Sequence, residues 1–260
     1  MNSGSMLTKE ETWLLQEKYQ GDKTAGFFAD CERLKVGEPL AYVIGQIPFL
    51  GSMIYLDSKP LIPRAETEFW VEYLIKEIKM PSEAKHRLAT TSPLRILDLC
   101  AGSGCIGVAL AKALPSIQVD FIEIDQNHLA LIEKNCRENK IQNDRVRIIT
   151  SDLFINLAET TAYDYIISNP PYIDPILDRT QASVKKFEPS LALYGGEDGL
   201  EIIRRIITEA PNYLKAKGEL WLEHEPEQTE AIKELGVPLF TVTTNQDQYQ
   251  VDRFSRLVLK

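Results

Sequence analysis

The sequence predicts an α/β protein with a parallel, doubly wound sheet, and three observations support this prediction. Apolar strand-like runs alternate with helical patterns from residue 94 onward, beginning with LRILDLC (94–100) and SGCIGVALAKAL (103–114). A glycine-rich stretch joins this first strand to this first helix. The last two strand-like runs, 238–244 and 253–260, are joined by a loop too short for a crossover, so we expect them to pair antiparallel.

The alternation predicts seven strands in all, at 94–100, 117–123, 145–150, 163–168, 218–223, 238–244 and 253–260. The helices between them are expected at 103–114, 127–140, 199–214 and 227–236. Residues 169–198 show neither period, and we expect a long irregular segment there. A parallel sheet that ends in an antiparallel hairpin is an unusual α/β arrangement, and this narrows the choice of fold.

The N-terminal part of the chain has a different pattern. Residues 7–35 are helical and rich in polar residues, with Trp13, Leu14 and Leu15 as the expected buried stripe. Two short strands are expected within 42–57 and an amphipathic helix at 66–79. Residues 80–93 lack periodicity and contain two prolines. We therefore expect two domains, a small helical one with a β-hairpin linker at 6–80 and a larger one at 93–260.

Composition excludes several classes of function. The chain has 29 Lys and Arg against 38 Asp and Glu, a net charge of −9 that disfavours a nucleic-acid partner. Its 4 cysteines form no CxxC pair and its 3 histidines have no ligand spacing, so neither a disulfide scaffold nor a metal site is expected. No apolar run is long enough to span a membrane, and the N-terminus does not look like a signal peptide. We expect a cytoplasmic protein.

The glycine-rich stretch indicates a nucleoside site. Asp98 ends the first strand, and Gly102, Gly104 and Gly107 follow with GxGxxG spacing. Glu123 ends the next strand, about twenty residues on, where a carboxylate can accept hydrogen bonds from ribose hydroxyls. The motif alone does not separate NAD from S-adenosylmethionine. A tight strand-to-helix turn without a ligand is a further alternative.

The segment ISNPPYI (167–173) leaves the fourth strand through Asn169 and two prolines. Proline fixes φ near −65° and has no N–H, so this turn is stiff and its acceptor oxygens are held in place. The Asn169 side-chain oxygen and the Pro170 carbonyl can accept hydrogen bonds from a planar NH₂ group, and Tyr172 can lie flat against that group. Positioning and electrostatics then suffice to methylate a weakly nucleophilic nitrogen without a strong base. A loop that merely ends a strand is the alternative.

Asp98, which suits a cationic sulfonium ligand, the terminal hairpin and NPPY together resemble the Rossmann-like class I methyltransferases, which use S-adenosylmethionine. In that group SDLF (151–154) stands where the adenine contacts lie. The resemblance implies that Asp152 accepts from the adenine amino group and that Leu153 packs on the ring. An N-cap of a helix is the alternative for Asp152.

Five separated segments narrow the resemblance: 37–72, 167–173, 187–200, LEHEPEQ (222–228) and DRFSRL (252–257). Over roughly 37–260 the chain resembles the release factor glutamine methyltransferase family. This implies methyl transfer to the N5 amide of the glutamine in the Gly-Gly-Gln loop of a peptide chain release factor, by an enzyme expected to be monomeric. The rival hypotheses are an N-methyltransferase acting on adenine or guanine in RNA or DNA, an inactive cofactor-binding scaffold, and an NAD dehydrogenase.

The resemblance also implies residue roles. The cofactor contacts would be Asp98, Cys100, Ala101, Gly102, Ser103, Gly104, Glu123, Asp152, Leu153 and Asn169. The catalytic and substrate residues would be Asn169, Pro170, Pro171 and Tyr172, with Arg64 also at the substrate. Glu66 and Glu68 would lie near the pocket mouth or simply be first-turn acids of a helix, and Glu188 with Pro189 would brace the loop after NPPY.

The chain departs from the family pattern in four places. Cys100 replaces the usual first glycine of the loop, which is tolerable if φ is negative there. Glu123 replaces an aspartate, with Asp125 as the alternative acid. LEHEPEQ lacks the usual glycine after its acid, and the helical segment before Gly37 is short.

Overall fold

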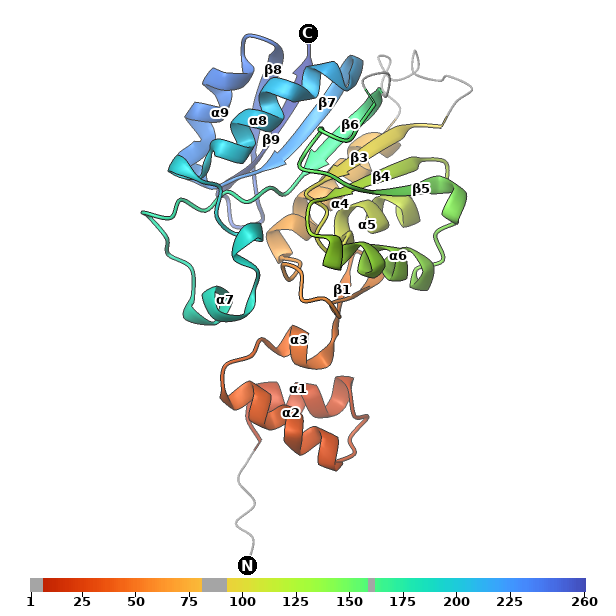
Figure 1. Cartoon of the computed structure of the whole chain (residues 1–260), viewed down its shortest axis with the longest axis vertical. Coiled ribbons are helices and arrows are strands. Elements are labelled where there is room, and N and C mark those ends of the chain that lie inside the picture. Colours follow the sequence, from red (N-terminus) through yellow and green to blue (C-terminus); the bar gives the residue numbers. More distant parts are fainter. Residues whose placement is uncertain (1–6, 81–92, 159–161) are drawn as a thin grey trace, which may run out of the picture.

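The computed structural model describes residues 7–80, 93–158 and 162–260. Its centre is a seven-stranded sheet in the order β5-β4-β3-β6-β7-β9-β8 (Figure 1). The strands are β3 (Arg95–Leu99), β4 (Gln118–Glu123), β5 (Val146–Thr150), β6 (Tyr163–Ser168), β7 (Leu214–Glu223), β8 (Phe240–Gln246) and β9 (Asp252–Leu259). The first five pair in parallel, whereas β9 lies antiparallel between β7 and β8. The predicted sheet with its terminal antiparallel hairpin is confirmed.

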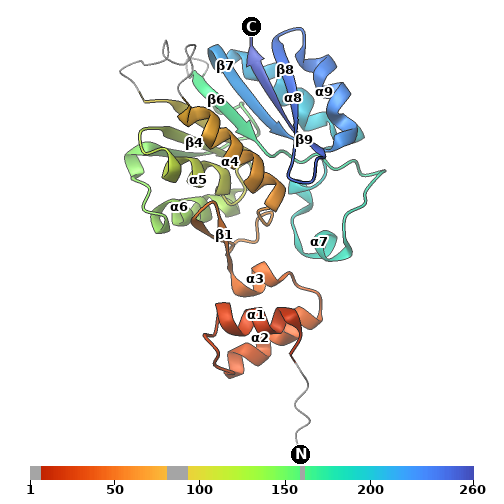
Figure 2. The ribbon, with the colours of Figure 1, turned by 180° about the vertical axis from the view of Figure 1, so that it is seen from behind.

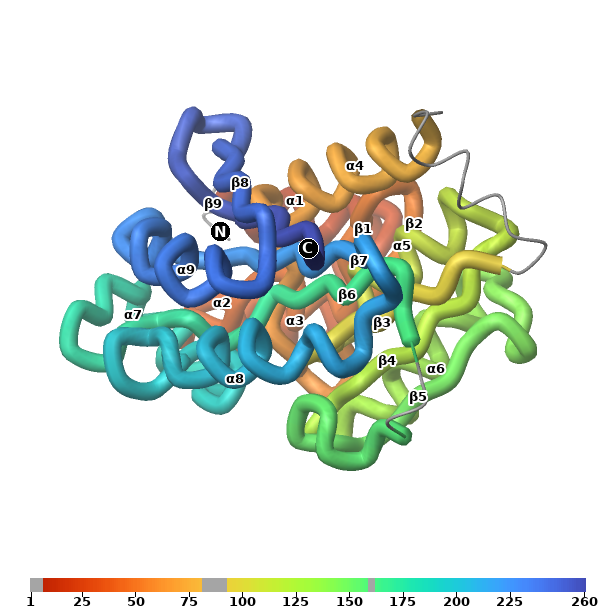
Figure 3. The backbone as a smooth tube through the Cα atoms, turned by 90° about the horizontal axis from the view of Figure 1, so that it is seen from above, coloured from red at the N-terminus to blue at the C-terminus, as the bar shows by residue number. Residues whose placement is uncertain are grey.

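Helices cover both faces of this sheet. Side chains of α4 (Ala65–Lys79), α5 (Cys105–Ala113) and α6 (Leu129–Glu138) share one hydrophobic core with one face. Those of α8 (Glu201–Glu209) and α9 (Thr229–Gly236) form a second core with the other face. Figure 2 shows α4 lying across the sheet, and Figure 3 shows the sheet between α4 and α8. The doubly wound layering predicted from the sequence is therefore present.

The segment expected to be irregular, 169–198, contains one short helix, α7 (Ala182–Phe187). Short 3-10 turns lie at Gln126–His128, Asn143–Arg145, Ser190–Ala192, Glu197–Gly199, Ala210–Asn212 and Pro226–Gln228. Apart from these, the predicted elements of the sheet domain occur with ends that shift by a few residues.

The N-terminal helices α1 (Lys9–Glu17), α2 (Ala25–Lys35) and α3 (Leu40–Ile44) form a separate small cluster around Leu14, Phe27, Cys31 and Val43. The expected buried stripe is wrong at Trp13, whose side chain is 48% exposed and packs under the ammonium of Lys9. The two strands predicted within 42–57 are β1 (Gln46–Phe49) and β2 (Ser52–Tyr55), and the start of that range belongs to α3.

The expected domain boundary at 80–93 falls mostly on residues 81–92, which lie outside the described residues. On the N-terminal side of this boundary, α4 buries Trp70, Val71 and Leu74 in the same core as Ile96 of β3 and Phe254 of β9. Stacked rings of Trp70 and Phe254, with centroids 6.0 Å apart, join helix and sheet. Helix α4 therefore belongs to the folded unit that contains the sheet.

A buried histidine follows β7. His224 is fully buried; its Nε2 lies 2.8 Å from Ser255 Oγ and its Nδ1 lies 2.9 Å from the Glu225 carbonyl oxygen. The carbonyl can only accept, so Nδ1 carries the proton and Nε2 accepts from the serine hydroxyl. Burial lowers the pKa of His224 to about 4.

We predict that this histidine destabilises the protein as the pH falls. Its folded pKa is below its unfolded value, so its contribution is complete above about pH 6.5 and is lost as the pH falls toward 4. Between pH 7 and pH 5 the linkage amounts to about 2 kcal/mol. Urea unfolding at both pH values, for wild type and His224→Gln, measures the difference. Equal losses of free energy of unfolding in the two proteins would contradict the prediction.

Candidate active site

The order of the strands places two loops at one edge of the sheet. From β3 the chain proceeds outward to β4 and β5, then returns to β6 on the other side of β3. Open α/β sheets bind ligands at such a reversal, beyond the carboxyl ends of the strands. Here the loop after Leu99 and the turn after Ser168 lie side by side, and Ser168 Oγ donates to the Leu99 carbonyl at 2.7 Å.

The loop after β3 needs its glycines. Gly104 has φ +75° directly before α5, a conformation that glycine adopts without strain. A Cβ on Gly107 would collide with the Phe121 ring and lie 2.9 Å from Asp98 Oδ2, so this glycine lets α5 pack closely on the sheet. Cys100, however, has φ +62°, so the negative φ expected for a tolerated cysteine is wrong. A left-handed non-glycine residue costs roughly 1–2 kcal/mol.

Glu123 ends β4 with its carboxylate fixed by the backbone. Its Oε2 accepts from the Gly102 N–H at 2.6 Å and its Oε1 accepts from the Asp125 N–H at 2.8 Å. Each carboxylate oxygen has a second acceptor site, so the group can still accept hydrogen bonds from ligand hydroxyls. The glycine loop and the acid of the predicted nucleoside site are thus in direct contact.

Asp98 is buried beneath the loop. Its Oδ2 accepts from the Gly107 N–H at 2.8 Å, and its Oδ1 is buried without a hydrogen-bond partner among the described residues. Burial, together with the charge of Glu123, raises the pKa of Asp98 to about 8. A cationic group bound near the loop would favour the ionised form of this acid. These two acids, one free to accept from ligand hydroxyls and one that favours a nearby cation, fit a nucleoside that carries a positively charged amino-acid part.

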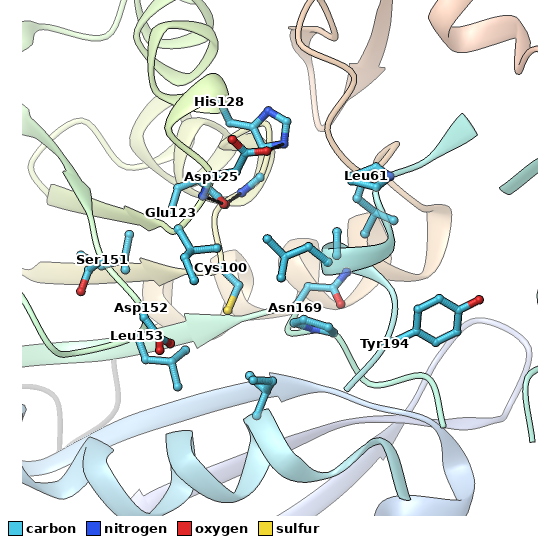
Figure 4. A pocket seen from close by; sticks show the side chains of 18 residues that line it. Leu61, Cys100, Glu123, Asp125, His128, Ser151, Asp152, Leu153, Asn169 and Tyr194 are labelled. Carbon is cyan, nitrogen blue, oxygen red and sulfur yellow. Dashed lines mark hydrogen bonds and ion pairs between the residues drawn. The ribbon is translucent and has the colours of Figure 1, made fainter. Parts of the chain in front are cut away.

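The loop after β3 and Glu123 line a partly open cavity of about 140 Å³, which we call the first cavity (Figure 4). Its predicted members are Cys100, Gly102, Glu123, Asp152, Leu153, Asn169 and Pro171. Asp125, the alternative acid, and Pro189, expected to brace the loop after NPPY, also line it. Its unpredicted members are Leu61, Ile122, Ile124, His128, Ser151, Leu191, Ala192, Tyr194 and Ile202. Asp98, Ala101, Ser103 and Gly104 do not line it.

Asp152 faces the first cavity and pairs with Arg205 at 3.0 Å. No helix begins there, since residues 152–157 form turns, so the N-cap alternative is wrong. The next residue, Leu153, has φ +48°. Two left-handed non-glycine residues, Cys100 and Leu153, thus line this cavity, and such strained backbone is often found at functional sites.

Asn169 lies in the wall between the first cavity and a second one. The second cavity is lined by Arg64, Pro170, Tyr172, Ile173, Arg179, Thr180, Gln181, Val184, Leu193 and Glu225. It shares Leu61, Asn169 and Ala192 with the first cavity. The NPPY turn therefore stands where a ligand in the first cavity would meet a group that enters through the second.

Arg64 borders the second cavity, where its guanidinium donates to Glu188 Oε1 at 2.7 Å. Glu188 Oε2 also accepts from the Ile62 N–H at 3.0 Å. This buried glutamate thus fastens the segment before α4 to the loop after NPPY. Glu66 and Glu68 lie in the first turn of α4, and Glu68 accepts from the Leu50 N–H at 2.7 Å.

The acid of LEHEPEQ, for which the sequence predicted no role, lies buried behind the NPPY turn. Glu223, at the end of β7, is 1% exposed and accepts from Thr67, Trp70 and Tyr172. Burial raises its pKa, and burial together with the charge of Glu223 raises the pKa of Tyr172 well above its usual value. The hydroxyl of Tyr172 donates to this acid, and this hydrogen bond fixes the orientation of the Tyr172 ring. The sequence feature that could have indicated Glu223 is its place at the end of a strand, the same place that Glu123 has on β4.

None of the described helices is long and apolar enough to cross a membrane. In the same described residues, no group of three or more His, Cys, Asp or Glu side chains is arranged to hold a metal ion.

Comparison with known proteins agrees with this geometry. Residues 85–188 match the family model of the methyltransferase small domain. A methyltransferase from Pyrococcus furiosus superposes with a TM-score of 0.57 at 18% identity, covering 91% of this chain and 99% of that one. The hMettl16 catalytic domain in complex with MAT2A 3'UTR hairpin 6 gives a TM-score of 0.59 at 20% identity, covering 81% and 76%. The fold is that of the class I methyltransferases.

Curated relatives identify the family within that class. Release factor glutamine methyltransferase of Streptococcus pneumoniae is 36% identical over 245 residues, covering 92% of this chain and 82% of that protein. The Geobacter sulfurreducens protein of the same name is 37% identical, covering 83% and 72%. Ribosomal protein uL3 glutamine methyltransferase of Bordetella pertussis is 35% identical, covering 74% and 62%. The chain belongs to the release factor glutamine methyltransferase family.

We predict that Glu123→Ala weakens binding of S-adenosylmethionine by roughly 10- to 100-fold, because it removes charge-assisted hydrogen bonds to ligand hydroxyls. Titration calorimetry measures the dissociation constant. Glu133→Ala, which removes an exposed glutamate of α6, is the matched control and should bind like wild type. Affinity that is unchanged in Glu123→Ala would mean that this acid does not contact the ligand.

Proposed function

We propose that this enzyme transfers a methyl group from S-adenosylmethionine to the N5 amide of the glutamine in the Gly-Gly-Gln loop of a peptide chain release factor. The observation that carries the proposal is the position of Asn169 between the two cavities, with acceptor oxygens that suit an NH₂ group. The names of the curated relatives support the substrate. A monomer in the cytoplasm is the accompanying proposal.

In this proposal the first cavity holds the methyl donor. The backbone-anchored carboxylate of Glu123 accepts from its ribose hydroxyls, while Leu153 and Asp152 flank its base. The buried Asp98 lies beneath the glycine loop, where the positive charge of the bound methyl donor favours its ionised form. When bound, S-adenosylmethionine supplies an activated methyl group on a sulfonium centre. As the amide nitrogen bonds to this methyl group, the S–CH₃ bond breaks, S-adenosylhomocysteine is the leaving group, and one amide proton is lost to water.

The second cavity admits the glutamine side chain. Asn169 Oδ1 and the Pro170 carbonyl accept hydrogen bonds from the two amide N–H groups. These hydrogen bonds hold the amide nitrogen so that it faces the first cavity. Both proline rings keep these acceptors rigid, and Tyr172 bounds the planar amide. The chain contributes orientation and preorganised acceptors rather than a strong base, a contribution typically worth several orders of magnitude in rate.

The rival substrate, adenine or guanine in RNA or DNA, has less support. A nucleic-acid substrate requires cationic contacts to phosphates, whereas this chain carries a net charge of −9. The likeness to the RNA-bound hMettl16 domain is at 20% identity and bears on the fold. Ribosomal protein uL3 is the better-founded second candidate, because relatives of comparable identity carry that substrate in their names.

The test is methyl transfer from radiolabelled S-adenosylmethionine to purified release factor. We predict incorporation into wild-type factor, none into a factor whose loop glutamine is replaced by alanine, and a loss of at least 100-fold with Asn169→Ala enzyme. Purified uL3 and bulk RNA are assayed in parallel. Label in uL3 or RNA without label in the release factor would overturn the substrate assignment.

A further inference from the structure

The orientation of the Asn169 amide is decisive for the reaction, and the structure contains a device that sets it. Asn169 Nδ2 lies 3.1 Å from Thr67 Oγ1, on helix α4. The two residues are 102 positions apart in the chain. Thr67 is 1% exposed, so this contact is inside the protein.

The direction of the hydrogen bond follows from the neighbours of Thr67. Its hydroxyl oxygen lies 2.6 Å from Glu223 Oε2, which also accepts from the indole N–H of Trp70 at 2.7 Å. Thr67, Trp70 and Tyr172 all point donors at Glu223, which favours its ionised form. An ionised carboxylate can only accept, so Oε2 takes the single threonine proton. The threonine oxygen is then left with lone pairs only, so the Asn169 atom that faces it must be the NH₂ group.

We propose that Glu223 is a positioning residue which, through Thr67, holds the Asn169 amide with its nitrogen toward α4 and its Oδ1 toward the substrate. The inference rests on the proposed function, since it explains how the acceptor for the glutamine amide is presented. Were the amide turned over, Asn169 would offer a donor to the substrate NH₂ and repel it. Tyr172, which donates to Glu223 Oε1 at 2.9 Å, is held by the same carboxylate.

This arrangement also gives α4 a role at the site. Thr67 and Trp70 lie on its buried face, one turn apart, and both donate to Glu223 at the end of β7. The carboxylate thereby joins three segments, α4, the turn after β6 and β7 itself. A rigid hydrogen-bonded support of this kind is what a precisely placed acceptor requires.

The test compares Thr67→Val with Thr67→Ser. Valine has the shape of threonine but no hydroxyl, so it removes the acceptor for Asn169 Nδ2, whereas serine keeps it. On release factor we expect kcat to fall about 30- to 100-fold in Thr67→Val. We expect Thr67→Ser to stay within about 3-fold of wild type, and both variants to bind S-adenosylmethionine with unchanged affinity.

Thr229→Val is the matched control, because Thr229 is also buried and its hydroxyl has no hydrogen-bond partner among the described residues. It should keep wild-type kcat. A kcat of Thr67→Val equal to that of Thr229→Val would overturn the inference. So would a Thr67→Ser variant as impaired as Thr67→Val, since that result would indicate a packing defect.

Glu223→Gln tests the carboxylate itself. We expect kcat to fall about 10-fold, and we expect little further loss when the change is added to Thr67→Val, because both changes act through Asn169. Fully additive losses would contradict a shared path. If wild-type enzyme labels no release factor, the proposed function is refuted rather than the role of Glu223 and Thr67. Nuclear magnetic resonance then still tests that role, because it needs no substrate.

Nuclear magnetic resonance reads the amide directly. The side-chain NH₂ signals of Asn169 are those that Asn169→Ala removes from the spectrum of uniformly ¹⁵N-labelled protein. We expect these signals to move and to exchange faster with solvent in Thr67→Val, and to persist in Thr67→Ser. Unchanged signals in Thr67→Val would show that Thr67 does not hold the amide, whatever the substrate proves to be.

Discussion

Parallel pairing of β3 with β6 is the constraint on which the rest of the molecule depends. It brings Leu99 level with Ser168, so the glycine loop and the NPPY turn leave the sheet at neighbouring points. The loops after β3, β4 and β5 contribute to the first cavity alone, whereas the segment after β6 borders both cavities. Asn169 belongs to both cavities because it is the first residue beyond that pair of strands.

Two acidic side chains of the site are buried, and burial disfavours their ionised forms. Asp98 and Glu223 are each 1% exposed, and burial raises the pKa of both. Asp98 accepts one backbone N–H, whereas Glu223 accepts from three side-chain donors. Buried carboxylates of this kind are costly unless they are compensated by hydrogen bonds or positive charge. The positive charge of a bound sulfonium ligand would favour the ionised form of Asp98, and the three donors around Glu223 compensate for the burial of that carboxylate.

The sheet and the two motifs could be predicted from the sequence because each is local. The apolar runs, the GxGxxG spacing and the Asn-Pro-Pro turn each lie within a short stretch of sequence. The order of the parallel strands then places the glycine loop and the turn side by side. Glu123 was predictable for the same reason, since it stands at the end of the next strand.

The support behind the turn could not be predicted in that way. Thr67 and Glu223 are 156 positions apart. The residues around Thr67 in the sequence indicate only that it lies in the first turn of a helix. The positive φ of Cys100 depends on how the loop closes against Glu123, which its residue type does not reveal. Trp13 has the apolar character of a core residue, but α1 buries Leu14 instead and leaves the indole at the surface.

Localising the transferred methyl group tests the central claim most directly. Release factor treated with wild-type enzyme and S-adenosylmethionine that carries a deuterated methyl group is digested and sequenced by fragmentation mass spectrometry. The account predicts one labelled methyl per factor, on the side-chain amide nitrogen of the glutamine in the Gly-Gly-Gln loop. A label on a lysine, an arginine or any other nitrogen would contradict an active site built to accept the two N–H bonds of a glutamine amide.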